Sequence, residues 1–287
     1  FAEAHGVARS HGSYEAQIDD PEIEVVYNPL PNSLHAEWSI KALRAGKAVL
    51  CEKPLASNAA EAQSIVDAAR ESGAPLIEAF HYRYHPVADF IVRTVRSGIL
   101  GRLTRMRAAM KVSAGLVAPG DIRFQADLAG GSAMDLGAYG VNIMRLVAGG
   151  EPEVIEASAD EVAPGVDGAM IARLRVEDGL VGELECALSA PAFEAALSIE
   201  GEDGRLEVAN PFLPQLGHRA VLEAGGETRT ERFDKTATYV FQARHVVEVV
   251  RHGGAVRTPG EDGVANMAVI DALYRAAGLR PRGSHSQ

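Results

Sequence analysis

The sequence has few cysteines, few basic residues and no long apolar run. Its 287 residues include two cysteines, Cys51 and Cys186, which are too few for a disulfide framework and typical of a reducing, cytoplasmic compartment. The 28 Lys and Arg residues against 39 Asp and Glu residues give a net charge of −11, whereas general nucleic-acid and anionic-membrane binders need a basic field. No apolar run approaches the roughly 20 residues of a membrane span. We therefore expect neither nucleic acid nor a membrane among the partners.

Several catalytic motifs are also missing. The sequence has no G-x-S-x-G nucleophile elbow, no P-loop, no H-E-x-x-H pair and no Cys/His cluster with zinc spacing. We therefore expect no metal site, and a metal-dependent hydrolase or isomerase would lack its ligands.

The first part of the chain alternates between strand-like and helix-like segments, and its length suggests about two domains. Short apolar runs at 23–28, 48–51 and 75–80 are separated by helical patterns at 33–45 and 58–73. This alternation with short connections predicts a parallel sheet. Since ligands of such sheets bind beyond the carboxyl ends of the strands, the loops that follow these runs are the candidates for chemistry.

The pattern changes from residue 86 onwards. A long strand at 102–113 and a helix at 133–148 precede consecutive strand-like stretches without intervening helices, which predicts a mainly antiparallel sheet. These stretches are 153–161, 168–176, 179–189, 193–200 and 204–209, and two helices follow at 238–252 and 261–277. The predicted domains are residues 1–85 (α/β), residues 86–280 (α+β, with a last helix able to pack back on the first domain) and a tail at 281–287.

Glu52-Lys53-Pro54, at the predicted end of the second apolar run, is the sharpest local motif. A lysine at this edge of a sheet can have its pKa adjusted by burial and can donate a proton or hydrogen bond to a substrate oxygen. The Lys53–Pro54 bond can be cis at such a turn. The alternative is a solvated loop lysine before a helix-entry proline, and the tripeptide by itself favours that simpler interpretation.

A second candidate site begins at Gly130-Gly131. On the predicted helix, Asp135, Tyr139 and Asn142 fall at i, i+4 and i+7 and share one stripe, while the glycines permit close approach to a ligand. The structural alternative is that Ser132 caps the helix, Asp135 completes a capping box and Tyr139 is packing. The motif leaves both interpretations open.

The loop at 80–86 brings together His81, Tyr82, Arg83 and a second histidine, which could recognise a cofactor or a polyol. A metal site there is disfavoured because no carboxylate or cysteine at ligand spacing joins the two histidines. His35 could line the same crevice or be an exposed first-turn residue.

Together these motifs resemble the Gfo/Idh/MocA family (glucose–fructose oxidoreductase and inositol dehydrogenase). Four segments in the same order carry the resemblance: YNPLPNSLH (27–35), GKAVLCEKP (46–54), YRYHP (82–86) and the Gly-Gly-x-x-x-Asp-x-Gly-x-Tyr helix. The LPNSLH loop is similar to that of the branch with dimeric dihydrodiol dehydrogenase and NADP-dependent xylose dehydrogenase. The resemblance implies a Rossmann-type parallel sheet followed by an α+β domain, whose open sheet implies a homodimer or dimer of dimers.

The same resemblance implies NAD(P)-dependent hydride transfer to or from a carbon of a sugar, polyol or diol, with NADP favoured over NAD. Lys53 would match the catalytic lysine, Asp135 the acid of the substrate site, and Tyr139 a proton donor or acceptor, because a nearby lysine cation favours the phenolate. The residues expected around the cofactor are Leu30, Pro31, Asn32, His35, Glu52, Lys53, Pro54 and Arg83, and those expected to bind substrate are His81, Tyr82 and Asn142.

The sequence departs from the family at its start. Relatives begin with a strand, a Gly-rich turn, a helix and a strand, whereas no G-x-G-x-x-G occurs at the head of this chain. We therefore expect an N-terminally incomplete Rossmann domain without the pyrophosphate-binding turn and the acid that reads the ribose. The alternative function is a non-enzymatic sugar- or nucleotide-binding protein, or an inactive truncated protein, on the same scaffold.

Overall fold

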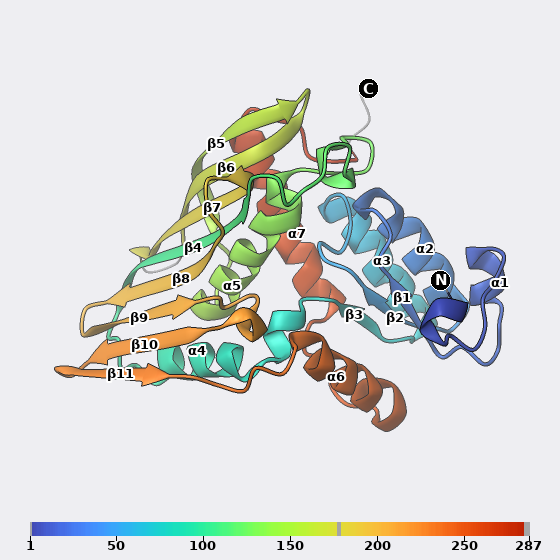
Figure 1. The fold of residues 1–287 in the computed structure, drawn as a ribbon, viewed down its shortest axis with the longest axis horizontal. Helices are drawn as coiled ribbons and strands as arrows, with labels where there is room; N and C mark the ends of the chain where they lie inside the picture. Colours follow the sequence, from blue (N-terminus) through green and yellow to red (C-terminus); the bar gives the residue numbers. More distant parts are fainter. Residues whose placement is uncertain (1, 177–178, 284–287) are drawn as a thin grey trace.

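The computed structural model describes residues 2–176 and 179–283, and it begins with a three-stranded parallel sheet (Figure 1). The strands are β1 (Val25–Asn28), β2 (Ala48–Cys51) and β3 (Leu76–Glu78), in the order β1-β2-β3. The helices of this unit are α1 (Tyr14–Ile18), α2 (His35–Arg44) and α3 (Ala59–Ser72). The side chain of Asn58 accepts the backbone N–H of Glu61, and Gly73 ends α3 with a φ of 70°, as the capping signals predict.

Eight strands of the described chain form a second, open sheet in the order β11-β10-β9-β8-β4-β7-β6-β5. Its strands are β4 (Leu103–Ser113), β5 (Glu153–Ala163), β6 (Val166–Arg175), β7 (Val181–Ala190), β8 (Glu194–Gly201), β9 (Gly204–Ala209), β10 (Arg219–Ala224) and β11 (Glu227–Glu231). β4 and β7 pair parallel, while the other neighbours pair antiparallel. The mixed α/β and α+β fold class is therefore confirmed.

Helices cover the inner face of the large sheet (Figure 1). They are α4 (Pro86–Arg96), α5 (Ala138–Ala148) and α7 (Gly260–Ala276), whereas α6 (Thr238–His252) lies away from this sheet and packs beside β3. α5 lies on β4 and β7, and α7 contacts α3, α5 and β5, so the last helix links the two sheets. Among the helices of the described residues, none is long and apolar enough to cross a membrane.

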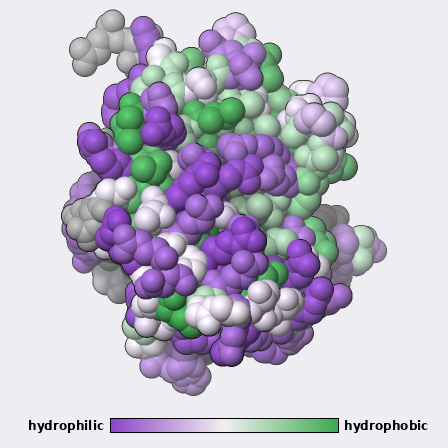
Figure 2. Space-filling view, turned by 90° about the vertical axis from the view of Figure 1, so that its left-hand side faces the viewer, coloured by the Kyte–Doolittle hydropathy of each residue, from purple (hydrophilic) through white to green (hydrophobic). Residues whose placement is uncertain are grey.

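The outer face of the large sheet is charged (Figure 2). In β7, Leu184 is buried on the inner face, while Glu183 and Glu185 point outward. Arg105 pairs with Glu183 at 2.7 Å and Arg107 with Glu185 at 2.6 Å, across the parallel β4–β7 pair. Hydrophilic side chains therefore spread over much of this face, with apolar patches between them.

The hairpin β10–β11 and the end of the chain differ from the sequence-based predictions. β11 is exposed along its whole length and carries no apolar residue, so it has no alternating pattern to detect. Arg282, in the predicted tail, has only 5% of its side chain exposed and pairs with Asp167 at 2.7 Å. The predicted domain limits remain predictions, and residues 284–287 of the predicted tail lie outside the described residues.

Candidate active site

Lys53 follows β2 at the carboxyl edge of the parallel sheet. Its peptide bond to Pro54 is cis, and the next residue, Leu55, donates its backbone N–H to the buried Glu78 carboxyl group at 2.9 Å. The Lys53 ammonium group donates to the backbone oxygen of Asp135 at 2.6 Å and to its carboxylate at 2.7 Å. With 9% of its side chain exposed, Lys53 is not the solvated loop lysine of the simpler alternative.

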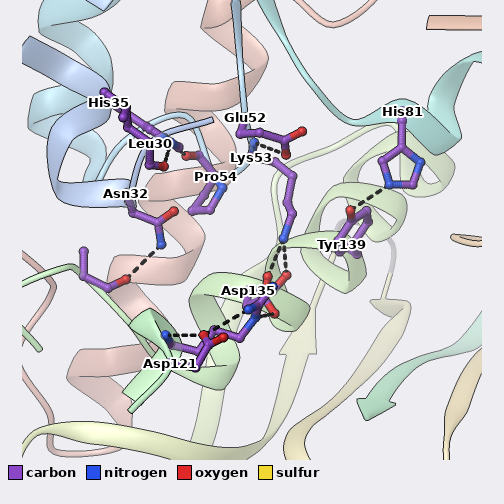
Figure 3. A network of polar contacts seen from close by, with 12 residues as sticks. Leu30, Asn32, His35, Glu52, Lys53, Pro54, His81, Asp121, Asp135 and Tyr139 are labelled. Atoms are coloured by element: carbon purple, nitrogen blue, oxygen red, sulfur yellow. Dashed lines mark hydrogen bonds and ion pairs between the residues drawn. The ribbon is translucent and has the colours of Figure 1, made fainter. Parts of the chain in front are cut away.

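Asp135 is held between two cations (Figure 3). Besides Lys53, Arg123 donates its Nε–H to the other carboxylate oxygen at 2.6 Å, and Arg123 also pairs with Asp121 at 3.0 Å. Burial alone would raise the pKa of Asp135, but the charges of Lys53 and Arg123 lower this pKa to about 2. Asp135 is therefore an ionised carboxylate near neutral pH.

The helix that carries Asp135 begins with a π-helical turn, Ala133–Gly137, instead of the predicted α-helical turn. Ser132 does not cap it: the Ser132 hydroxyl donates to the Asp167 carboxylate at 2.7 Å. The same carboxylate accepts the backbone N–H of Ala133 at 2.7 Å. Asp167, from β6, therefore supplies the cap that the sequence analysis considers for Ser132.

The three residues of the predicted stripe do not share one environment. Asp135 lies in the π turn, whereas Tyr139 and Asn142 both lie in the α-helical segment that follows it. Asp135 and Tyr139 line one cavity, whereas Asn142 is fully buried and accepts the Tyr82 hydroxyl at 2.6 Å. Arg83 pairs with Asp262 of α7, 3.1 Å away. The structure thus places Tyr82, Arg83 and Asn142 in a separate buried network.

Tyr139 lies between Lys53 and His81 (Figure 3). The Lys53 nitrogen is 4.7 Å from the centre of the Tyr139 ring, and the His81 Nε2 atom is 3.0 Å from the Tyr139 hydroxyl. The family resemblance, together with the nearby lysine charge, predicts that Tyr139 is shifted toward the phenolate. The structure gives the opposite direction, because burial and the charge of Glu52 raise the Tyr139 pKa well above its usual value. Tyr139 is thus a protonated phenol at neutral pH.

These side chains open onto a cavity of about 490 Å³. Its polar wall contains two cations, Lys53 and Arg123, and three carboxylates. The carboxylates are Glu52, Asp121 and Asp135, and the apolar wall includes Pro29, Leu30, Met110, Val112 and Leu116. The cavity is therefore amphipathic, with its polar groups gathered at Lys53.

His35 joins the loops that follow β1 and β2. Its ring nitrogens lie 2.9 Å from the Pro54 carbonyl and 2.8 Å from the Leu30 carbonyl. Burial lowers the pKa of His35. A neutral ring has one N–H and donates to only one of these two carbonyl oxygens. The structure therefore excludes the exposed first-turn alternative and gives His35 contacts that hold Leu30 next to Pro54.

Sequence reasoning missed Arg123, Asp121 and Tyr239 as lining residues of the cavity. Arg123 and Asp121 stand in a segment without regular periodicity, and Tyr239 comes from α6, far along the chain. No local sequence pattern could have predicted that these residues line the same cavity as Lys53. Within residues 2–176 and 179–283, no group of three or more His, Cys, Asp and Glu side chains is arranged to hold a metal ion.

The donor set at the carboxyl edge fits the nicotinamide end of a dinucleotide. Pro29 and Leu30 offer an apolar surface for a planar ring, and the Glu52 carboxylate can accept ribose hydroxyl groups. Glu52 is oriented by the Tyr27 hydroxyl, which donates to it at 2.7 Å. Asn32, next to the half-buried Pro31, donates to the backbone oxygen of Ala129 at 2.9 Å and so joins this loop to the segment before Asp135.

Comparison with known proteins agrees with this arrangement. Residues 1–80 match the oxidoreductase family with an NAD-binding Rossmann fold, and residues 91–207 match the GFO/IDH/MocA C-terminal domain. D-xylose 1-dehydrogenase (NADP(+)) 2 of Haloferax volcanii is 35% identical over 281 residues, which are 96% of this chain and 85% of the relative. Human trans-1,2-dihydrobenzene-1,2-diol dehydrogenase is 31% identical over 259 residues, which are 88% of this chain and 76% of that protein.

Solved structures show the same architecture. Aldose-aldose oxidoreductase from Caulobacter crescentus, complexed with glycerol, superposes with a TM-score of 0.87 at 27% identity and covers 96% of this chain and 85% of its own. A 3-ketoreductase from Actinomadura kijaniata, complexed with NADP and TDP-benzene, gives a TM-score of 0.86 at 27% identity, with 98% and 85% covered. The chain belongs to the Gfo/Idh/MocA family of oxidoreductases with an NAD-binding Rossmann fold.

Proposed function

We propose that this chain transfers a hydride between NAD(P) and a carbon that bears a hydroxyl or carbonyl group in a neutral sugar, polyol or diol. The observation that carries the proposal is the convergence of Lys53, Asp135 and Tyr139 on one cavity at the carboxyl edge of the parallel strands. NAD(P), when bound, supplies or accepts the hydride. The protein's own residues bind the substrate oxygen and move its proton.

In the reducing direction, the Tyr139 phenol gives its proton to the substrate oxygen as the carbonyl carbon gains the hydride. The raised pKa of Tyr139, which comes first from burial, keeps this proton available at neutral pH. The Lys53 ammonium group donates a hydrogen bond to the same oxygen and stabilises the charge that develops on it. In the oxidising direction, the substrate hydroxyl proton returns to Tyr139.

Asp135 sets the orientation of Lys53. Its carboxylate and backbone oxygen each accept a hydrogen bond from the ammonium group, which fixes the lysine near the Tyr139 ring. This pairing also offsets the lysine charge, so Tyr139 is a proton donor rather than a phenolate in the resting site. Asp135 thereby acts in the substrate site as an ionised carboxylate that positions Lys53, and not as a proton donor.

The substrate class follows from the charge of the cavity wall. Three carboxylates against two cations disfavour a phosphorylated or carboxylated substrate, while the apolar wall tolerates a hydrocarbon edge. The names of relatives that act on xylose and on a benzene diol point to the same class. NADP is proposed over NAD because the xylose relative is named for NADP(+).

The direct test of this proposal uses the purified chain with NADPH and NADH. Enhancement of nicotinamide fluorescence is expected on titration with either cofactor, and more strongly with NADPH. Turnover of NADP(+) is expected with at least one neutral sugar, polyol or trans-diol, and not with the matching sugar phosphates. Binding without turnover across the panel would favour the non-enzymatic alternative.

A second copy of the chain is proposed to cover the outer face of the eight-stranded sheet, giving a homodimer or dimer of dimers. That face carries interleaved Arg and Glu side chains, which can complement themselves across a two-fold axis, and exposed Ile155 and Ile171. Light scattering after size exclusion should give at least twice the chain mass, and a monomer would contradict this.

A cytoplasmic location is also proposed, because Cys51 and Cys186 are both free and buried. The location of a fluorescently tagged chain in the cell tests this proposal.

A further inference from the structure

The buried ring of His81 uses only one of its two nitrogens. His81 is 1% exposed, and its Nε2 atom lies 3.0 Å from the Tyr139 hydroxyl oxygen. Its Nδ1 atom is buried and has no hydrogen-bond partner within the part of the chain that the structure describes. The two atoms at 3.0 Å can share a proton in either direction, so the tautomer of His81 decides the direction of the bond.

Burial favours one tautomer. Burial first, and then the charge of Lys53, lower the pKa of His81 to about 3, so the ring is neutral and carries a single N–H. A proton on Nδ1 would be a buried donor without an acceptor, and orphaned buried N–H groups are rare in proteins. A proton on Nε2 would instead be donated to Tyr139. With the proton on Nε2, Nδ1 is left as a buried acceptor without a donor. This costs less free energy than a buried N–H without an acceptor.

We propose that His81 is a positioning residue that holds its proton on Nε2 and donates it to the Tyr139 oxygen, which leaves the phenolic proton to point at the substrate. This inference rests on the proposed function, because it assigns the direction of proton donation within that site. If His81 were the acceptor, the phenolic proton would point away from the cavity. Donation from His81 also stabilises the Tyr139 oxygen when its proton has left.

The packing around the two rings keeps this geometry. The Tyr239 ring lies against the His81 ring with centroids 4.3 Å apart, and the Phe80 ring meets the Tyr139 ring edge-on at 5.6 Å. Figure 3 shows Lys53 and His81 approaching Tyr139 from different sides. The charged and titratable groups whose fields act on Tyr139 or His81 are Lys53, Glu52, Asp135, Tyr82 and Tyr239.

Kinetics of two variants separate this role from simple packing. His81→Gln retains an N–H donor, whereas His81→Met has a similar size and none. We expect the Met variant to lose about tenfold or more in kcat with little change in KM, while the Gln variant keeps most of the wild-type kcat. The alkaline limb of the kcat profile should also move to higher pH in the Met variant, because its phenolate has lost a donor. Equal kcat values for both variants would overturn the proposal.

The tautomer of His81 can also be measured directly, in an experiment that does not depend on enzyme activity. Imidazole ¹⁵N spectra of the ligand-free chain, with the His81 signals assigned by their loss in His81→Gln, should show a protonated Nε2 and an unprotonated Nδ1. A protonated Nδ1, or an imidazolium ring near neutral pH, would overturn the proposal. Absence of turnover by the wild-type chain would instead sink the proposed function, so the two failures are distinguishable.

Discussion

At the scale of single residues, the proposed chemistry depends on a phenol that its surroundings keep protonated. Tyr139 is buried among the rings of Phe80, Tyr82 and Phe212. Its hydroxyl group is directed by His81, and the Lys53 charge beside it is offset by Asp135. These contacts favour Tyr139 as a proton donor. Loss of its hydroxyl group should therefore affect the proton-transfer step rather than the fold.

Replacement of Tyr139 by Phe should therefore lower kcat by roughly 10²–10⁴-fold, because general acid–base groups contribute about that much. Steady-state kinetics with the best substrate of the panel measure the effect. Tyr84→Phe is the matched control: it also removes a buried hydroxyl, bonded to Thr258 at 2.6 Å, but outside the cavity. Equal losses in the two variants would show that the phenol acts only through packing.

The buried carboxyl group of Glu78 should make the free energy of unfolding decrease with rising pH. Burial, and then the charge of Asp262, raise its pKa from about 4.5 to about 8. The folded chain therefore keeps a proton that the unfolded chain releases, so the free energy of unfolding should fall as pH rises between these values.

The expected decrease is up to a few kcal/mol, since each pKa unit corresponds to about 1.4 kcal/mol. Urea unfolding at a series of pH values should show this slope in the wild type and lose it in Glu78→Gln. Glu71→Gln, at a side chain that is 68% exposed, should keep the slope. An unchanged slope in the Glu78 variant would contradict the assignment.

At the scale of elements, the sequence predicts where the candidate site lies better than it predicts how its side chains are arranged. The end of a strand made Lys53 a candidate, and the diglycine before the helix did so for Asp135 and Tyr139. Only the family resemblance favoured these residues over the solvated-lysine and capping alternatives. The π turn had no sequence signal, and the Asp167 carboxylate that caps its first residue comes from a distant strand. Asn142 was grouped with Asp135 and Tyr139 by helical spacing, which could not reveal that its partner is Tyr82 from another segment.

The contact between α5 and β7 depends on the absence of a side chain at Gly140. A Cβ atom there would lie 2.2 Å from Cδ1 of Leu184, so Gly140→Ala should destabilise the fold by about 1–3 kcal/mol. Combined with Leu184→Ala, the glycine substitution should cost less than it does in the wild-type background. Denaturant unfolding of the four proteins measures this coupling, and strict additivity would contradict the close approach.

At the scale of the whole molecule, the end of the chain ties the two sheets together. Arg282 pairs with Asp167 of the large sheet, and its backbone oxygen accepts the Asn58 side chain at 2.9 Å, at the start of α3. Asp167 in turn caps the turn that carries Asp135. The position of the proposed active-site cavity therefore depends on a segment that composition alone assigns to a tail.

Arg282→Met should destabilise the chain by about 3–5 kcal/mol, because it leaves the buried Asp167 carboxylate with neutral donors alone and without its cationic partner. Arg275→Met removes an arginine that is 64% exposed and pairs with Asp271, so it should cost less than about 1 kcal/mol. Thermal or urea unfolding compares the two variants. Similar small effects would show that the buried pair does not hold the sheets together.

The central claim is that Lys53 acts on the reacting oxygen of a nicotinamide-dependent oxidoreductase. The most direct measurement compares turnover and NADPH affinity of wild type, Lys53→Met and the surface control Lys41→Met, in the longest form of the protein that the coding sequence supplies. We predict that Lys53→Met abolishes turnover and leaves cofactor affinity within a few-fold, while Lys41→Met behaves as wild type. Undiminished turnover in Lys53→Met would contradict the account.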